Sequence, residues 1–470
     1  MEVAVFGTGY VFRKYRNKIS CNICCLVDNA PDKQGDVIEG IRVIPPDELS
    51  SCEYTYIVVM TFEYAEIEQQ LLKMGVPREK ILNYTHICAI RNSYPQVHIN
   101  NNRKPLEEWL NVNRGKKKFL LVSHDFSYTG VPAALLNMAL VLKRMGYAVI
   151  MAGLTGGAIV RELEINDINY LEELNICYGT EWFGTMAVGF DYIIAGTLVL
   201  NKFVYRCSFL PVRILWWLHE SDSDLYENTD ISWLSENIKI YGGGNRVIDT
   251  FRMSYPDKNI EKLLYCISKT KSVNHKTDMC DQNITFAVVG TICYRKAQDI
   301  AINAIKSVSQ KYSGHFRCLV IGADSGIEYD YCRTIEEEIS HIEEIKRIGE
   351  MNQEQLDRIL QQIDVLLCPS RDDPMPIVVT QAMMHGKVCI IAENVGQAEY
   401  IRQGENGFRF KNESIEDLTG YMVWAIEHKE MLYQIGNCSR EVYDNNFSEE
   451  VMERNIRNIL DEWDDKGICE

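Results

Sequence analysis

The stretch from Asp364 to Gly386, DVLLCPSRDDPMPIVVTQAMMHG, decides the fold class of this chain. Residues Asp364 to Cys368 predict a buried strand, and a helix is expected to begin near Pro376 and to end at Gly386. Proline in the first helical turn loses no hydrogen bond, and glycine adopts the left-handed conformation that often ends a helix. A strand, an acidic loop and a helix in this order indicate an α/β protein with a parallel sheet.

The same stretch suits an anionic ligand. A helix N-terminus presents unpaired N–H groups and the positive end of the helix dipole, so phosphate groups bind there readily. We expect Met375, Pro376 and Ile377 beside such a ligand, with Asp373 at the mouth of the loop and Gln381 about one turn further into the helix. Taken alone, the stretch is as compatible with an ordinary α/β unit whose acidic loop is solvated.

Composition places the chain among globular proteins. It has 470 residues, of which 46% are apolar and 24% charged. This balance is typical of soluble proteins, and the length suggests about three domains. No apolar run approaches the roughly 20 residues that cross a bilayer. The first residues, Met1 to Gly7, lack the basic region of an export signal. We therefore predict a cytoplasmic protein.

The net charge of −17 argues against nucleic acid as a partner, because neutralisation of phosphates provides most of that affinity. One basic cluster, Arg114 with Lys116 to Lys118, could face an anionic ligand or a membrane surface. A solvated linker end explains the cluster more simply, and peripheral contact with the inner face of a membrane stays an open expectation.

Cysteine usage favours reduced thiols. The 16 cysteines are scattered through predicted strands and helices of a long chain, unlike the framework of a small disulfide-rich domain. Cys21 and Cys24 have the spacing of metal ligands, but no second pair of cysteines or histidines follows at a zinc-finger interval. We predict no metal site.

Hydrophobic patterning divides the chain into three units in which strands and helices alternate. The units are residues 1–95, 117–280 and 281–447, with a linker at 96–116 and a C-terminal helix at 448–470 that could cross back toward the second unit. The expected fold is α/β, a small Rossmann-like domain followed by two more Rossmann-like domains. If these two face each other by the carboxyl ends of their strands, ligands bind in a cleft between them.

Three further loops follow predicted strands and could carry chemistry. Gly130 lies just before Pro132 at a helix start and would let a ligand approach the backbone, although a plain tight turn is as compatible. His219 ends an apolar strand, where a histidine is more often a hydrogen-bonded residue at the edge of the core. Gly396 opens a turn that could permit close approach of a ligand.

A fourth loop carries two cations. Gly290 follows a strand, and Arg295 and Lys296 stand at the start of the next helix. Cations are poor partners for the positive end of a helix, since the first turn prefers acids. Beside a diphosphate they are good partners, and a solvated basic turn is the alternative.

From about residue 117 to residue 465 these segments resemble a family 4 glycosyltransferase of the GT-B fold. The matching pieces are the Gly130 loop, the His219 strand end, the Gly-x4-Arg-Lys-x-Gln-Asp segment at 290–299, the loop and helix from Asp373 to Gln381, and the Gly396 turn. Each piece is weak evidence alone, whereas five in the same order and spacing are specific.

The resemblance implies transfer of a sugar from a nucleotide-diphosphate donor, such as a UDP- or GDP-sugar, to a glycan or lipid-linked acceptor in polysaccharide or glycoconjugate synthesis. It also implies retention at the anomeric carbon without a bound metal or other cofactor. By position, Arg295 and Lys296 would neutralise the diphosphate, and His219 would lie near the sugar at the reaction centre. Asp373 would lie near the hydroxyls of the transferred sugar and Gln381 at the nucleotide ribose.

Two residues depart from the family's usual pair of glutamates. Asp373 is shorter by one methylene, and Gln381 is neutral, although its carbonyl oxygen can still accept a hydrogen bond from ribose. A non-catalytic nucleotide-sugar sensor is therefore the second hypothesis.

The N-terminal unit carries a partial dinucleotide fingerprint. Gly7 and Gly9 follow the first strand, and Asp28 ends the second strand about 20 residues on, where an acid that binds ribose is expected. Phe12 stands at the position of the third glycine. The unit could bind a nucleotide or nucleotide sugar, or dock a protein partner. An NAD-dependent oxidoreductase or epimerase is the third hypothesis.

Overall fold

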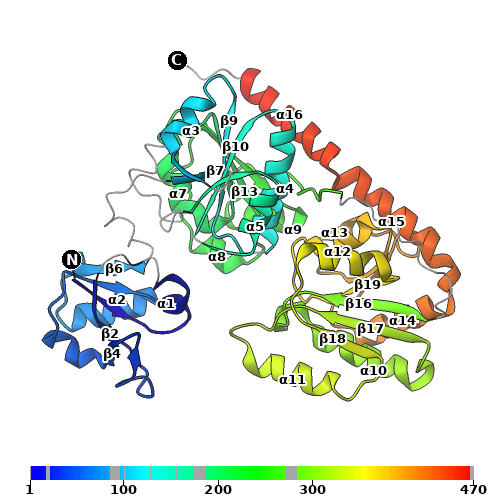
Figure 1. The fold of residues 1–470 in the computed structure, drawn as a ribbon. Coiled ribbons are helices and arrows are strands. Elements are labelled where there is room, and N and C mark those ends of the chain that lie inside the picture. The colour runs from blue at the N-terminus through cyan, green and yellow to red at the C-terminus, as the bar shows by residue number, and fades with distance from the viewer. Residues whose placement is uncertain are drawn as a thin grey trace.

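The computed structural model describes residues 2–16, 19, 22–84, 96–99, 102–127, 129–154, 156–172, 187–269 and 283–465. Within them the chain forms three largely parallel β-sheets, each flanked by helices (Figure 1). We call the corresponding parts the N-terminal, middle and C-terminal domains. Cys21, one of the two cysteines with metal-ligand spacing, lies outside the described residues.

The N-terminal domain has six strands in the order β3-β4-β2-β1-β5-β6. The chain begins in the centre of the sheet, builds outward on one side and then returns to build the other. Its strands are β1 (Glu2–Phe6), β2 (Asn22–Val27), β3 (Val37–Ile38), β4 (Ile41–Ile44), β5 (Tyr56–Val59) and β6 (Ile81–Asn83), and its helices are α1 (Tyr10–Tyr15) and α2 (Tyr64–Lys73).

The middle domain has nine strands in the order β15-β14-β13-β12-β9-β10-β11-β7-β8. Its parallel strands are β9 (Lys118–Ser123), β10 (Ala148–Gly153), β11 (Asn169–Glu172), β12 (Tyr192–Gly196), β13 (Arg213–Leu218), β14 (Ile238–Gly242) and β15 (Glu261–Lys262). The helices include α4 (Gly130–Arg144), α5 (Ile159–Ile165), α7 (Asn201–Cys207), α8 (Ser223–Glu227) and α9 (Asn245–Ser254).

The linker expected at residues 96–116 is largely part of this middle sheet. Strands β7 (Gln96–Ile99) and β8 (Asn102–Pro105) form an antiparallel pair, β7 pairs with β11, and α3 (Leu106–Val112) follows. Val97 and Trp109 are buried in the core of the middle domain. The sequence was misleading because β8 lies at the edge of the sheet with most of its side chains exposed, so the segment is predominantly polar.

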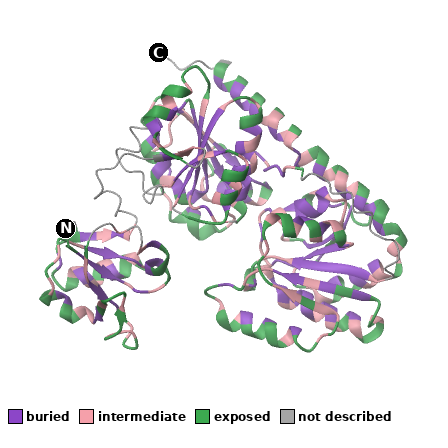
Figure 2. Cartoon of the chain, in the orientation of Figure 1, coloured by how far each residue is buried: buried purple, intermediate pink, exposed green. Residues whose placement is uncertain are grey.

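The C-terminal domain has six parallel strands in the order β18-β17-β16-β19-β20-β21. The strands are β16 (Ile284–Val289), β17 (Phe316–Ile321), β18 (Ile345–Ile348), β19 (Val365–Cys368), β20 (Val388–Ala392) and β21 (Phe408–Phe410). The helices are α10 (Gln298–Tyr312), α11 (Tyr329–Ile339), α12 (Gln353–Gln362), α13 (Ile377–Met384), α14 (Ile415–Glu427) and α15 (Leu432–Asn446). The central strands are buried on both faces, as expected for parallel sheets covered by helices (Figure 2).

The stretch at 364–386 folds as its pattern predicts. Strand β19 is buried throughout, α13 follows the acidic loop and ends at Met384, and Gly386, after the C-cap residue His385, has φ +65°. The predicted α/β class with Rossmann-like sheets is confirmed. Among the described residues, no helix is both long enough and apolar enough to span a membrane.

Helix α16 (Glu449–Asp465) leaves the C-terminal domain and runs along the middle domain (Figure 1). Asp464 accepts hydrogen bonds from Lys117 and Arg213, both at 2.8 Å, and Glu462 accepts one from Lys239 at 2.6 Å. The three cations lie at the amino ends of β9, β13 and β14. The helix therefore packs across the end of the middle sheet at which these strands begin. The carboxyl ends of the strands lie at the opposite end of the sheet.

Candidate functional site

The carboxyl ends of β16 and β19 bring the predicted cations and the predicted acid together. The two strands are neighbours in the sheet, so the segment after Gly290 meets the loop before α13. Lys296 forms an ion pair with the Asp373 carboxylate, and Arg295 lies 3.5 Å from the same oxygen. Asp373 is 6% exposed. One carboxylate against two cations leaves the cluster with an excess positive charge at the start of α13.

Arg371 holds the segment that carries these cations. Its guanidinium donates to both carboxylate oxygens of Asp299, at 2.6 and 3.0 Å, and stacks over the ring of Tyr294 at 3.9 Å. Its backbone N–H donates to the carbonyl oxygen of Arg295 at 2.9 Å. Burial opposes ionisation of Asp299, but hydrogen bonds from Arg371 and Tyr331 outweigh it and lower the pKa of Asp299. Arg371 was not among the site residues predicted from the sequence.

Hydrogen bonds from Gln397, Tyr265 and Gly396 fix the start of α13 and the loop before it. The carbonyl oxygen of Pro376, which precedes the first helical residue, accepts hydrogen bonds from the Gln397 side chain at 2.8 Å and from the Tyr265 hydroxyl at 3.2 Å. Gly396 donates its N–H to the carbonyl oxygen of Asp373 at 2.9 Å. A Cβ atom on Gly396 would overlap the Pro374 carbonyl oxygen. Gly396 therefore shapes the loop by packing against its backbone.

The remaining predicted residues of this region lie in the same neighbourhood. Met375 and Ile377 flank Pro376 at the start of α13. Gln381 is 4% exposed, and its side-chain amide makes no hydrogen bond with a described residue. Gly290 has φ +148°, which favours glycine, and a Cβ there would lie 3.6 Å from the Lys296 side chain.

On the middle domain, the carboxyl end of β13 presents His219. Its Nε2 atom is buried without a hydrogen bond, and its ring lies 4.5 Å from that of Trp217. Burial, reinforced by the nearby His124, lowers the pKa of His219 to about 3. The imidazole is therefore neutral near neutral pH. Gly130 is the first residue of α4, and a Cβ on it would meet nothing within 4 Å.

Two adjacent glycines lie between His219 and the loop before α13 of the C-terminal domain. A Cβ on Gly243 would lie 2.8 Å from Nδ1 of His219, and a Cβ on Gly244 would lie 2.7 Å from Cε of Met375. Both glycines follow β14. Larger residues would separate the two domains here, so the run of glycines at 242–244 was a signal in the sequence that the prediction did not use.

Polar contacts close the same junction. Asp372 accepts a hydrogen bond from Ser221 at 3.1 Å and forms an ion pair with Arg246, which also donates to the carbonyl oxygen of Asn394 at 2.6 Å. Ser221 and Arg246 belong to the middle domain, whereas their partners belong to the C-terminal domain. Arg246 had no recognisable pattern in the sequence.

Glu220 fixes the backbone around His219. Its carboxylate accepts hydrogen bonds from the backbone N–H groups of His219 at 3.0 Å and Leu198 at 3.1 Å, and from the Thr197 hydroxyl. Thr197 has φ +116°, a conformation that side chains rarely adopt. Three independent contacts on one carboxylate hold this strained strand end in place.

These elements gather most of the predicted site residues along one junction between two domains. Among the described residues, no three His, Cys, Asp or Glu side chains are grouped so that they could hold a metal ion.

Three parts of the chain match known families. Residues 273–442 match Glycosyl transferases group 1, residues 115–239 match Glycosyl-transferase family 4, and residues 1–82 match the C2185-like N-terminal domain. A comparison with curated proteins finds no significant match. Two glycosyltransferase family models thus match successive parts of the chain after a distinct N-terminal domain, which confirms the resemblance inferred from the sequence.

Solved structures agree on the fold. HepE (Alr3699) of Anabaena, in complex with UDP and glucose, superposes with a TM-score of 0.63 at 15% identity over 74% of this chain and 100% of that chain. A glycosyltransferase from Rickettsia africae gives 0.61 at 16% identity over 74% and 98%. Sucrose-phosphate synthase of Thermosynechococcus elongatus gives 0.58 at 12% identity over 75% and 100%. The GT-B fold predicted from the sequence is confirmed.

Proposed function

We propose that this protein is a retaining, metal-independent glycosyltransferase. It moves a sugar from a UDP- or GDP-sugar to a glycan or lipid-linked acceptor, on the cytoplasmic side of the membrane, in polysaccharide or glycoconjugate synthesis. One observation carries the proposal: Lys296, Arg295 and Asp373 form a charged cluster at the start of α13, and His219 adjoins the same loop through Gly243 and Gly244.

The cluster suits a leaving group that gains negative charge. As the glycosidic bond breaks, charge builds up on the diphosphate, and fixed cations beside a helix N-terminus stabilise that state more than the bound donor. Arg371 and Asp299 hold the cations in position, so little reorganisation is needed during the reaction.

The proposed chemistry is a displacement on one face of the sugar. The bond between the anomeric carbon and the diphosphate oxygen breaks while the acceptor oxygen bonds to the same face of that carbon. The acceptor proton passes to the leaving phosphate oxygen. Asp373, held by two cations, hydrogen-bonds the sugar hydroxyls and does not attack the sugar. Trapping a covalent sugar adduct on Asp373 would overturn this scheme.

Neutral His219 contributes hydrogen bonding. An imidazole can accept a hydrogen bond at one nitrogen and donate at the other, and Nε2 of His219 has no protein partner. In this proposal it binds a hydroxyl of the transferred sugar. Because its pKa is lowered, it adds no positive charge next to an oxocarbenium-like centre.

A donor screen tests the proposal. Nucleotide release is measured for UDP- and GDP-sugars, with and without glycan acceptors, and the ligands of the HepE structure make UDP-glucose the first donor to try. Lys296→Ala should lower turnover by about two orders of magnitude, the typical effect of removing one charge-stabilising group. Lys306→Ala is the control, since Lys306 lies on α10 and pairs with Glu338.

The outcomes separate the two functions. Turnover with one donor that is lost in Lys296→Ala supports the enzyme. Tight binding of a nucleotide sugar without turnover for any acceptor would make the protein a sensor. The neutral Gln381 at the position of the family's second acid motivates this alternative.

A further inference from the structure

The N-terminal domain has a cavity of its own at the point where its strand order reverses. The cavity has a volume of about 220 Å³ and lies at the carboxyl ends of β1 and β5, beside Gly7, Gly9 and Asp28. In open α/β sheets ligands bind at this place. The described residues around it therefore indicate which ligand it would take.

The Asp28 carboxylate is already occupied by its own loop. One of its oxygens accepts hydrogen bonds from the Thr8 N–H at 2.9 Å, the Thr8 hydroxyl at 2.5 Å and the Lys33 ammonium at 3.2 Å. The other oxygen accepts from the N–H of Ala30 at 3.0 Å. One oxygen already accepts from three donors and the other from one, so Asp28 stabilises its own loop and is poorly placed to accept from both hydroxyls of a ribose.

The cavity also lacks the features that hold a diphosphate. Phe12, at the position of the third glycine, is 1% exposed and fills the space between α1 and the sheet. Of the described residues that line the cavity, Asp28 and Glu63 are acidic and Lys33 is the one cation, which already pairs with Asp28. A net negative lining repels the two phosphates of a dinucleotide.

The rim of the cavity is aromatic. Tyr10 is 64% exposed and Phe62 is 72% exposed, and their ring centroids lie 6.1 Å apart. Thr61 and Glu63 add hydrogen-bonding groups to the lining, whereas the Asn29 amide is paired with the Gln70 amide by two hydrogen bonds of 2.9 Å. Exposed rings beside a carboxylate and a hydroxyl group match a sugar, which presents an apolar C–H face and several hydroxyls.

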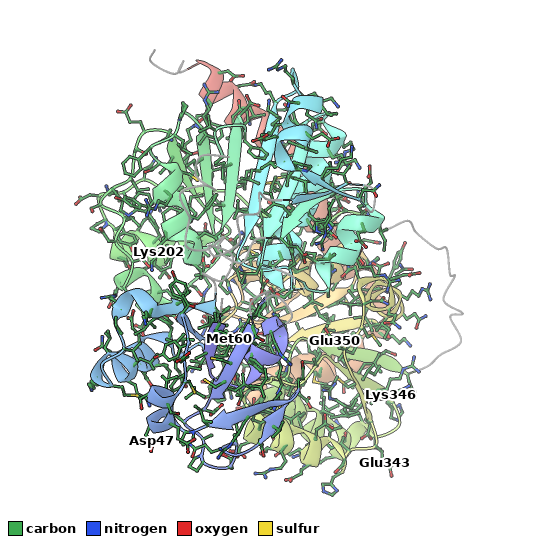
Figure 3. All side chains as sticks on the ribbon, turned by 60° about the vertical axis from the view of Figure 1, so that its left-hand side comes forward. Asp47, Met60, Lys202, Glu343, Lys346 and Glu350 are labelled. Carbon is green, nitrogen blue, oxygen red and sulfur yellow. The ribbon has the colours of Figure 1, made fainter. Side chains whose placement is uncertain are left out.

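The cavity lies on the side of the domain that meets the rest of the chain. Leu154, which follows β10 in the middle domain, packs against the hydrophobic cluster that contains Val11, Phe12 and Tyr15 of α1. In the view of Figure 3, Met60, which lines the cavity, is drawn toward the middle of the picture, and Asp47 toward its lower left edge. The cluster beneath α1 thus contacts the segment that follows β10.

We propose that this cavity is a carbohydrate-binding site for a neutral sugar residue of the acceptor glycan. Tyr10 and Phe62 stack on the sugar ring, and Glu63 and Thr61 bind its hydroxyls. The assignment to the acceptor rests on the proposed glycosyltransferase function, whereas the assignment to a sugar rests on the lining alone.

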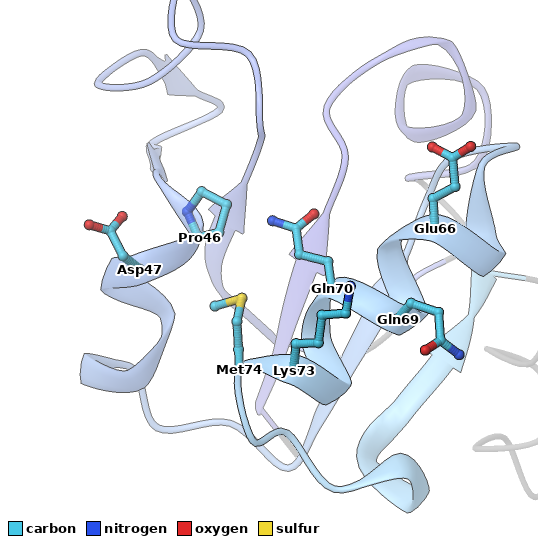
Figure 4. Close-up of a pocket in the computed structure, with 7 residues that line it drawn as sticks. All are labelled: Pro46, Asp47, Glu66, Gln69, Gln70, Lys73 and Met74. Carbon is cyan, nitrogen blue, oxygen red and sulfur yellow. The ribbon is translucent and has the colours of Figure 1, made fainter.

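A second hollow of the domain offers a contrast. The groove in Figure 4 has a volume of about 550 Å³ and lies between α2 and the turn at Pro46. Its lining has no aromatic ring: Pro46, Asp47, Glu66, Gln69, Gln70, Lys73 and Met74. The groove therefore provides a control position in the same domain.

Saturation-transfer NMR on the full chain tests the proposal. The probes are maltose, cellobiose, lactose and diacetylchitobiose, with NAD and UDP as competing ligand classes. Phe62→Ala should weaken binding of at least one disaccharide by roughly tenfold, the value of a lost aromatic contact of about 1.4 kcal/mol. Phe209→Ala, at a residue that is also 72% exposed but in the middle domain, and Gln69→Ala should leave binding unchanged.

Two results would overturn the proposal. One is that no disaccharide binds in a manner sensitive to Phe62→Ala or Tyr10→Ala. The other is that these substitutions remove binding of NAD or UDP. Nucleotide release from the donor without acceptor should be unchanged in Phe62→Ala, so loss of the glycan site is distinguishable from failure of the transferase function.

Discussion

Gln381 is the residue at which this site differs most in charge from the family pattern. Its amide is buried and has no described hydrogen-bond partner, so it offers a neutral acceptor where an ionised one is usual. Hydrogen bonds to an ionised acceptor are roughly twice as strong as neutral ones. The substitution Gln381→Glu restores the ionised acceptor and thus tests whether the neutral amide weakens binding of the donor.

We expect Gln381→Glu to lower the KM for the nucleotide-sugar donor about fivefold, because the carboxylate binds ribose by about 1 kcal/mol more strongly. Steady-state kinetics with the preferred donor measures it. Gln362→Glu, on the exposed side of α12, is the matched control. An unchanged KM in both variants would show that Gln381 does not contact the donor.

His219 predicts a pH dependence of stability. Its pKa is about 3 in the folded protein and ordinarily 6.5. Between these values the unfolded chain binds a proton that the folded protein does not, so the free energy of unfolding falls as pH drops below 6.5. At pH 5 the loss amounts to at most about 2 kcal/mol.

Denaturant unfolding of wild type and His219→Gln at neutral and acidic pH measures this loss. The variant should lose less stability between the two conditions, whereas His315→Gln, at an exposed histidine, should follow the wild type. Equal pH slopes in all three proteins would contradict the buried, neutral state of His219.

At the scale of elements, the turn after β20 determines the shape of the loop before α13. We expect Gly396→Ala to destabilise the C-terminal domain by about 2 kcal/mol, because the added methyl overlaps the Pro374 carbonyl oxygen. Gly420→Ala, inside α14 with no atom near the new methyl, should instead stabilise by roughly 0.5 to 1 kcal/mol. Calorimetric melting measures both, and a neutral Gly396→Ala would refute the packing argument.

The elements of the site were predictable where pattern and chemistry coincide. Strand β19, the start of α13 and the cations at 295 and 296 follow from buried apolar runs, proline and glycine positions and charge. Arg371 and Arg246 were not predictable, because long side chains reach partners whose distance in sequence carries no pattern. The hairpin of β7 and β8 was missed because its exposed side chains hide its pairing with β11.

At the scale of the whole molecule, Arg246 fastens the middle domain to the C-terminal domain beside the site. It contacts Asp372 and the carbonyl oxygen of Asn394, and Lys262 pairs with Glu399 further along the same junction. Opening of a GT-B enzyme around its donor would have to break these contacts. We call these contacts between the two domains the latch. Because Asp372 directly precedes Asp373, opening of the latch would also release the loop before α13.

We expect Arg246→Ala to loosen this junction. Small-angle X-ray scattering should show a larger radius of gyration than for wild type, and the KM for the donor should rise severalfold since the closed arrangement is less populated. Arg252→Ala, on the same helix and without an ion pair among the described contacts, serves as control. Scattering curves that coincide for all three proteins would disprove a latch.

The packing of α16 on the middle domain has a consequence for folding during synthesis on the ribosome. Lys117 and Asp464 are 347 positions apart, and Arg213 and Asp464 are 251 apart. At ordinary translation speeds, on the order of ten seconds or more therefore pass between synthesis of the amino ends of the strands in the middle sheet and synthesis of the helix that covers them. During that interval the cations at these strand ends and the ring of Tyr192 are exposed to the cell, so chaperones would meet the nascent chain at the edge opposite the site.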